Sequence, residues 1–394
     1  MNIILTDNAK RENLLPLTFT RPVGEIRVGA FTFAERWKKI FNANVSFYTL
    51  CYLSKKYPSN IKETNILIDG GIFPDHNIIQ LIKKLKLNQA LVYNGAIVAA
   101  NVSESEVMPT DQLNISNFEC FELEKLLEIN YCFDIFRLNG EAIDIDYKLI
   151  TKGRKSAVPS TTNTLIAAEN IFIEESVQME GVIINAKTGP VYIGENAEIM
   201  EGSVIRGPFV LCNNSTLKIG AKIYGPTTIG PHSKVGGEIN NSIIFGYSNK
   251  AHDGFLGNSV IGEWCNIGAD SNNSNLKNNY AEVRLWNYKS EKFDHTGLQF
   301  CGLIMGDHSK CGINTMFNTG TVVGVSANIF GPGFPRNFIP SFSWGGNHGF
   351  ITYTKPKAYE VAKLVMERRG IEFNATEKEI LTYIFELTAK YRNF

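Results

Sequence analysis

The chain has 394 residues, of which 44% are apolar, 11% aromatic and 20% charged, an ordinary composition for a globular protein of two or three domains. Its 39 basic and 39 acidic residues cancel, so no overall field draws it to nucleic acid or a membrane. The apolar opening is too short for a signal peptide or a spanning helix, and seven cysteines without a CxxC pair favour reduced thiols in the cytoplasm.

Residues 1–150 are predicted to form an α/β domain with a mostly parallel sheet, because strand-like and helix-like segments alternate. Residues 134–147 are expected to connect this domain to the next, and the polar, basic stretch 151–164 is predicted to be a linker. The expected elements, in chain order, are strand 2–5, helix 30–41, strand 45–53, strand 65–68, helix 77–87, strand 90–100 and helix 119–128.

Between residues 165 and 330 an apolar residue, mostly aliphatic or sulfur-containing, returns at every sixth position in several runs, Ile183 and Phe255 among its members, and residues 165–335 are predicted to form one domain. A period of six fits neither a helix nor a simple strand, and it predicts a parallel β-helix whose repeated residue points inward. Glycine often follows, as at Gly194 and Gly220, where we expect corners with positive φ. The longest unbroken run is Ile193, Ile199, Ile205, Leu211, Leu217, Ile223, Ile229 and Val235.

The repeat breaks between residues 275 and 300, which predicts a loop inserted on one face of the β-helix. Residues 336–394 are predicted to be a C-terminal extension with two helices, 357–369 and 376–391. Thr376, with Glu379 three residues later, predicts a capping box at the start of the second helix. Terminal helices of this kind cap the open end of a solenoid or pack on a neighbouring subunit.

A histidine interrupts the segment 248–257. His252 lies between Ala251 and Asp253, and because the interior of a β-helix is aliphatic, its side chain is expected to face outward. A neutral imidazole can take a proton from an attacking amine near neutral pH. The alternative interpretation is a solvent-exposed turn histidine without a chemical role.

Four motifs follow one another from His252 onward. They are His252-x-x-Phe255-Leu256-Gly257, Val260-Ile261-Gly262, Asn266-Ile267-Gly268-Ala269 and Asn275. Through these motifs residues 190–330 resemble the acetyltransferase domain of the bifunctional glucosamine-1-phosphate acetyltransferase / N-acetylglucosamine-1-phosphate uridylyltransferase family. The resemblance implies a left-handed β-helix that forms a homotrimer and binds acetyl-CoA between subunits, and it implies a role for each matching residue.

In that family the histidine is the general base, which assigns this role to His252. The resemblance places the acetyl group donor beside Ala269 and Asn275. It assigns sugar and sugar-phosphate contacts to Asn266, Phe255, which replaces a tyrosine, and Lys277. Two further family positions, basic in the family, become Tyr224 and Asn240 here, for which Arg206 and Lys234 can compensate, and Asp270 replaces a glycine.

The first 22 residues resemble the opening of sugar-phosphate nucleotidyltransferases, through Ile3 to Arg11, then Leu15-Pro16-Leu17-Thr18 and Arg21-Pro22. In that family a glycine-rich loop wraps phosphates with backbone N–H groups, and this chain lacks those glycines. The resemblance implies nucleotide binding by Arg11, Arg21 and Arg27. It implies Mg²⁺ on Asp69, although Asp-Gly-Gly is also an ordinary turn.

Together the two resemblances imply N-acetylation of a hexosamine 1-phosphate by acetyl-CoA, paired with uridylyl transfer from UTP. Two alternatives stay open: a sugar-1-phosphate nucleotidyltransferase with the β-helix as trimerisation platform, and a non-catalytic β-helix scaffold. A zinc site on His232, His252, His295 and His308 is disfavoured, because these residues lie in separate coils without convergent spacing. No nucleic acid or membrane partner is expected.

Overall fold

The computed structural model describes all residues, 1–394, and they divide into two compact units. The first unit comprises residues 1–26 and 31–131, and the second comprises residues 27–30 and 132–394. The domain boundary expected at residue 150 therefore lies earlier. The reason is that the predicted connecting segment 134–147 lies within helices α4 (Cys132–Arg137) and α5 (Asn139–Thr151) of the second unit.

Buried polar contacts tie α5 into the second unit. Asn139 is fully buried, its side-chain amide donates to the Pro226 carbonyl at 3.0 Å, and its oxygen accepts from Thr228 Oγ1 at 3.1 Å. A buried amide with both groups satisfied fixes its helix in one position.

The first unit is built on a six-stranded sheet in the order β4-β1-β5-β7-β6-β8. Strand β1 pairs in parallel with β4 and β5, and β6 with β8, whereas β7 runs antiparallel to both β5 and β6. The predicted, mostly parallel sheet is confirmed. Its elements are β1 Asn2–Thr6, α1 Phe33–Phe41, β4 Asn44–Tyr48, α2 Cys51–Ser54, β5 Thr64–Asp69, α3 His76–Lys84, β6 Gln89–Tyr93, β7 Ala96–Ser103 and β8 Glu119–Glu122.

Three predicted elements of this unit were wrong, one of them in part: the strand expected at 45–53 ends at Tyr48, and Cys51–Ser54 form helix α2. Residues 90–100 form the hairpin β6–β7 rather than one strand, because Asn94 and Gly95 both take positive φ and reverse the chain. Residues 119–128 contain strand β8, not a helix, since backbone pairing with β6 outweighs the helical preference of the glutamates.

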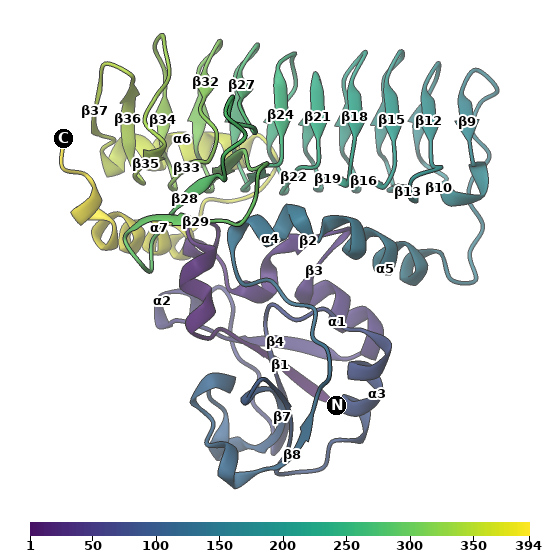
Figure 1. Ribbon diagram of the computed structural model, residues 1–394, viewed down its shortest axis with the longest axis vertical. Coiled ribbons are helices and arrows are strands. Elements are labelled where there is room, and N and C mark those ends of the chain that lie inside the picture. Colours follow the sequence, from purple (N-terminus) through teal and green to yellow (C-terminus); the bar gives the residue numbers. More distant parts are fainter. The chain divides into compact units, whose positions relative to one another are not determined.

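The second unit is a parallel β-solenoid, which confirms the predicted β-helix, and Figure 1 shows its coils stacked side by side. Each coil contributes strands to three faces. The first face holds β9 Thr164–Ile166, β12 Ile183–Asn185, β15 Val204–Arg206, β18 Lys222–Tyr224, β21 Glu238–Asn240 and β24 Phe255–Gly257. The second holds β10 Ile171–Ile173, β13 Val191–Ile193, β16 Phe209–Leu211, β19 Thr227–Ile229, β22 Ile243–Ile244, β25 Val260–Ile261, β30 Leu303–Met305, β33 Thr321–Val323 and β35 Phe338–Ile339.

The third face is the longest and reaches Thr352, beyond the predicted end of the β-helix at 335, because the hairpin β36–β37 extends it. It holds β11 Gln178–Met179, β14 Glu198–Ile199, β17 Thr216–Leu217, β20 Lys234–Val235, β23 Asn249–Lys250, β26 Asn266–Ile267, β31 Lys310–Cys311, β34 Asn328–Ile329, β36 Ser343–Gly346 and β37 Gly349–Thr352.

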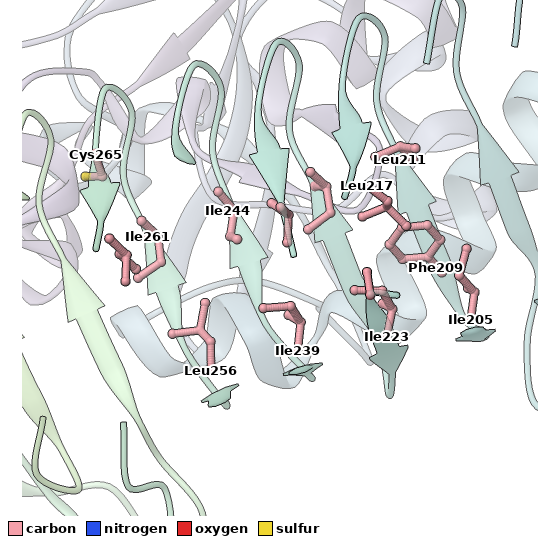
Figure 2. Packing of buried hydrophobic residues seen from close by; sticks show 14 of the residues in the cluster. Ile205, Phe209, Leu211, Leu217, Ile223, Ile239, Ile244, Leu256, Ile261 and Cys265 are labelled. Carbon is pink, nitrogen blue, oxygen red and sulfur yellow. The ribbon is translucent and has the colours of Figure 1, made fainter. Parts of the chain in front are cut away.

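The repeated aliphatic residues fill the interior of the solenoid. Figure 2 shows Ile205, Leu211, Leu217 and Ile223 converging there, and each is at most 1% exposed. Ile183, predicted to point inward, is 42% exposed, and its neighbour Ile184 is buried instead. Likewise, Phe255 was predicted to point inward but is only partly buried, and its neighbour Leu256 lies in the core instead. A shift of one residue along a strand moves a side chain to the opposite face.

The predicted positive φ at the glycine that follows a repeated residue is confirmed at Gly220 and wrong at Gly194. Of the two glycines named, only Gly220 has positive φ, at +68°. At Gly194 a Cβ would lie 2.4 Å from Asn213 Oδ1 and 2.8 Å from its backbone nitrogen. Glycine there permits the close approach of two coils.

The insertion predicted at 275–300 is the antiparallel hairpin of β28 (Arg284–Asn287) and β29 (Lys292–His295). The C-terminal helices are α6 (Lys355–Glu367) and α7 (Ala375–Leu387). Asn374, not Thr376, is the N-cap of α7 and accepts from Glu377 N at 3.0 Å, so the capping box was wrong by two residues. None of the helices combines the length and apolar character that a membrane span requires.

Candidate functional site

The first face of the solenoid gathers several of the residues assigned to the sugar phosphate. In successive strands Tyr224 lies opposite Asn240, and Asn240 lies opposite Gly257. Arg206 and Tyr224 line an open cavity of about 980 Å³ on the same face. The Tyr224 hydroxyl is held by Glu238 Oε1 at 2.5 Å, and burial together with this carboxylate raises the pKa of Tyr224 to about 12.

Gly257 is the point where the aromatic ring of Phe255 and the amide of Asn275 meet. A Cβ on Gly257 would lie 2.5 Å from Phe255 Cζ and 2.7 Å from Asn275 Nδ2. The Asn275 amide also donates to Asn258 Oδ1 at 2.8 Å. Two residues far apart in the motif therefore form one surface, and only glycine leaves room for it.

His252 is exposed in the turn between β23 and β24, three residues before Phe255. The turn is held from inside by Lys250, which is 1% exposed and whose ammonium donates to the carbonyls of His252 at 2.5 Å and Asp253 at 2.9 Å. Burial lowers the pKa of Lys250 to about 8, although Asp253 opposes the shift. This lysine was not predicted as a site residue.

The next coil places Ala269 in the turn directly above the His252 turn. The backbone nitrogen of Asp270 donates to the Asp253 carbonyl at 3.1 Å, which joins the two turns. Asp270 adopts φ +54°, a conformation that aspartate tolerates better than most residues. The family's glycine at this position is thus replaced by a residue suited to the same backbone.

Two of the assigned residues lie elsewhere in the chain. Asn266 belongs to the third face, beside Asn249, and not to the face that carries Phe255. Lys277 lies in the inserted segment, donates to the Glu282 carbonyl at 2.7 Å and lines a separate cavity of about 650 Å³ with Arg336. Within one chain Asn266 therefore lies on a different face from Phe255.

The first unit has a second polar site around Asp69, at the carboxyl end of β5. The Lys10 ammonium lies 2.5 Å from Glu128 Oε2 and 3.6 Å from Asp69 Oδ2, and Asn8 donates to the latter oxygen. Burial raises the pKa of Asp69 to about 6, against the opposing effect of Lys10. Burial lowers the pKa of Lys10, but the two carboxylates outweigh it and the pKa is raised.

The predicted Mg²⁺ does not fit this arrangement. Lys10 takes the position between the carboxylates of Asp69 and Glu128 that a cation would need. Within residues 1–394 no three His, Cys, Asp or Glu side chains come together in a manner that could hold a metal ion. The chain's own lysine therefore offsets part of the negative charge of these two carboxylates.

The three arginines predicted to bind nucleotide are buried. The Arg11 guanidinium donates to the Thr18 carbonyl and, at 2.9 Å, to the Tyr52 hydroxyl, and its Nε lies 3.2 Å from Asp7 Oδ2. Arg21 is 4% exposed. Arg27 belongs to the second unit, where it donates to the Ala30 carbonyl. None of the three presents its guanidinium to solvent.

The chain thus combines a mixed, mostly parallel sheet unit with a parallel β-solenoid, and each unit carries a polar site. Residues 3–155 match the family model described as sugar nucleotidyl transferase. Over much of its length the chain is also similar to proteins described as bifunctional sugar nucleotidylyltransferase/acetyltransferases.

Three relatives illustrate this relationship. A bifunctional sugar-1-phosphate nucleotidylyltransferase/acetyltransferase of Sulfurisphaera tokodaii is 25% identical over 69% of this chain and 65% of its own length. The bifunctional protein GlmU of Methanocaldococcus jannaschii is 36% identical over 22% of this chain and 21% of its own. GlmU of Rippkaea orientalis is 27% identical over 39% and 34%. The chain thus spans less than two thirds of each relative's length.

Solved structures with some likeness include a UDP-N-acetylglucosamine acyltransferase, 13% identical, over 59% of this chain and 95% of that one, with a TM-score of 0.24. An N-acyltransferase from Bacillus cereus is 10% identical over 55% of this chain and 100% of that one, with a TM-score of 0.23. Scores this low add nothing to the assignment.

Proposed function

We propose that the solenoid transfers an acetyl group from acetyl-CoA to the amine of a hexosamine 1-phosphate. The observation that carries the proposal is the His252 turn, which Lys250 holds from inside and which directly precedes Phe255, whose ring meets Asn275 at Gly257. An exposed imidazole close in the chain to an aromatic and amide surface suits a polar acceptor that must lose a proton.

The chemistry needs one base. The neutral imidazole of His252 takes a proton from the amine as its nitrogen attacks the thioester carbonyl. An N–C bond forms, the C–S bond breaks, and the proton passes to the departing thiolate of coenzyme A. Phe255 and Asn275 position the reactants, while Tyr224, Asn240 and Arg206 extend the same face toward the phosphate.

The test is thiol release from acetyl-CoA with glucosamine 1-phosphate as acceptor. A positioned general base is worth ~10²–10⁴ in rate, so His252→Ala should lower turnover by about that factor. His348→Ala is the matched control, because His348 is also exposed but lies in the turn between β36 and β37. Acceptor-dependent release that is equal in both variants would remove His252 from the mechanism.

We further propose that the solenoid works as a homotrimer. Asn266 and Phe255 are both assigned to the sugar but lie on different faces of one chain, so a neighbouring chain is needed to bring them together. Ile183 and Val204, 42% and 41% exposed on the first face, are apolar groups that such a contact would cover. Light scattering that gives a monomer mass under conditions of full activity would contradict this assembly.

For the first unit we propose nucleotidyl transfer to a sugar 1-phosphate, supported by the family match of residues 3–155. Exchange of labelled pyrophosphate into UTP is the direct assay. Exchange without acetyl transfer would favour the nucleotidyltransferase with a structural solenoid. If neither UTP nor acetyl-CoA raises the melting temperature, the non-catalytic scaffold is favoured, since a ligand of the native state stabilises it.

A further inference from the structure

One corner of the solenoid, where each coil passes from the second face to the third, has left-handed backbone. In the early coils the residue there is asparagine, Asn196 with φ +55° and Asn214 with φ +59°. Asparagine enters this region readily, whereas bulky residues do so rarely. The following coils nevertheless carry His232, Tyr247 and Trp264, with φ of +60°, +61° and +61°.

These side chains form a stack along the corner. The ring centroids of His232 and Tyr247 are 4.8 Å apart, those of Tyr247 and Trp264 are 4.2 Å apart, and the planes are within 11° of parallel. Trp264 and His308 continue the series at 6.2 Å. In these coils aromatic residues therefore stand where the early coils have asparagine, and together they form a continuous aromatic wall. The wall consists of His232, Tyr247, Trp264 and His308.

A cavity of about 490 Å³ lies beside this wall on the third face. Tyr247 and Trp264 line one side, and Val365, Arg368 and Arg369 at the end of α6 line another. The strands between them contribute a row of polar residues in register. That row is Lys234, Asn249, Asn266 and Lys310. A volume of this size suits a small organic ligand rather than a single ion.

The cavity is strongly cationic. Lys234, Lys310, Arg368 and Arg369 all line it, and across residues 1–394 none of them forms an ion pair with a carboxylate. Arg369 Nη2 reaches Asn249 Oδ1 at 3.4 Å, and the Lys310 ammonium donates to a backbone carbonyl at 2.9 Å. Burial lowers the pKa of Lys310 to about 8, although Cys265 opposes the shift.

We propose that this cavity binds a nucleotide, that is, a ligand with two or more phosphate groups joined to a planar base. The four cations match the charge of a polyphosphate, and arginine in particular pairs with phosphate oxygens through two parallel hydrogen bonds. The aromatic wall supplies the apolar surface for the base. Ala269 and Asn275, assigned to acetyl-CoA, do not line the cavity, and of the residues assigned to the sugar only Asn266 does.

The test is calorimetric titration of the full chain with inorganic pyrophosphate, adenosine 3′,5′-bisphosphate and UDP, without acetyl-CoA or acceptor. Saturable binding is expected, and Arg369→Gln should weaken it about tenfold or more through loss of a charge-assisted hydrogen bond. Arg336→Gln is the matched control, since Arg336 lines the separate cavity near Lys277. Because no turnover is measured, this result is independent of acetyl transfer.

The three probes separate the sources of such a ligand. Tighter binding of adenosine 3′,5′-bisphosphate supports the proposal with a coenzyme as source, and tighter binding of UDP supports it with a nucleotide sugar. Either preference should shrink in Trp264→Phe. Equal affinity for pyrophosphate and both nucleotides overturns the role of the aromatic wall. The site itself is overturned by absence of binding, or by equal loss in Arg369→Gln and Arg336→Gln.

Discussion

Each unit of the chain places a lysine ammonium at its candidate site, and the two lysines are held in opposite ways. In the first unit Lys10 contacts two carboxylates, Asp69 and Glu128. In the solenoid Lys250 is enclosed by the core, and its ammonium donates to backbone carbonyls of the His252 turn. The pKa of Lys10 is raised, and that of Lys250 is lowered to about 8.

The difference shows that the hydrogen-bond partner decides the direction of a buried lysine's pKa shift. A carboxylate offsets the loss of water around an ammonium by direct attraction, whereas a carbonyl dipole offsets only part of it. Lys10 therefore offsets part of the negative charge of Asp69 and Glu128, whereas Lys250 is a positioning residue that fixes the backbone beside His252. Replacing each lysine by methionine, which keeps the length and removes the charge, separates these roles.

The largest effect is expected for Lys10→Met. Removing one partner of a buried ion pair costs about 3–5 kcal/mol, because the remaining charge is left uncompensated. The Lys10 side chain is 37% exposed, so solvent screening should reduce the loss in unfolding free energy to about 2 kcal/mol. Urea unfolding at pH 7 measures it.

The exposed Lys62, whose side chain has no ion-pair partner, provides the control as Lys62→Met. The double variant Lys10→Met with Asp69→Asn should regain part of the loss, since one of the two unpaired carboxylates is removed. A stability unchanged by Lys10→Met would mean that water already compensates both carboxylates. It would contradict the role of Lys10 as their stabilising partner.

The same contrast explains what the sequence predicts and what it hides. The period of six identified the solenoid because inward positions are filled by one kind of residue. It did not identify Lys250, because the predicted series of inward residues contained Phe255. The residues that point inward there are each one position further along the chain. They are Ile244, Lys250 and Leu256, which are also six apart.

The first unit has no such period. The pairing of Lys10 with Glu128 joins residues more than one hundred positions apart, and no sequence motif near either residue indicates it. Residues 119–128 were expected to be a helix, so the placement of Glu128 beside β5 could not follow from sequence. Tertiary pairing at a sheet edge overrode local preference there.

A smaller effect is expected for Lys250→Met, and it should appear in activity rather than stability. A buried charge replaced by an apolar side chain of similar length is neutral or stabilising. The His252 turn, however, loses two hydrogen bonds, and misplacement of the base should lower acetyl transfer about tenfold, equivalent to about 1.4 kcal/mol. Thiol release and urea unfolding on the same preparation measure both; unchanged activity would show that the turn is held without the lysine.

The smallest effect is a dependence of stability on pH. The pKa of Lys250 is about 8 in the folded chain and 10.5 when it is unperturbed, so between these values the unfolded chain binds more protons. Unfolding free energy must then rise with pH, by about 1 kcal/mol between pH 8 and pH 9 from this group alone. The rise should appear as the difference between wild type and Lys250→Met, and it should be absent from the difference between wild type and Lys187→Met, which alters an exposed lysine of the same solenoid. The difference in unfolding free energy between wild type and Lys250→Met could instead fall with pH or stay constant. Hydrogen bonds to the carbonyls of His252 and Asp253 would then stabilise the charged ammonium enough for it to keep its proton. In that case Lys10 and Lys250 would differ in the geometry of their contacts and not in their charge.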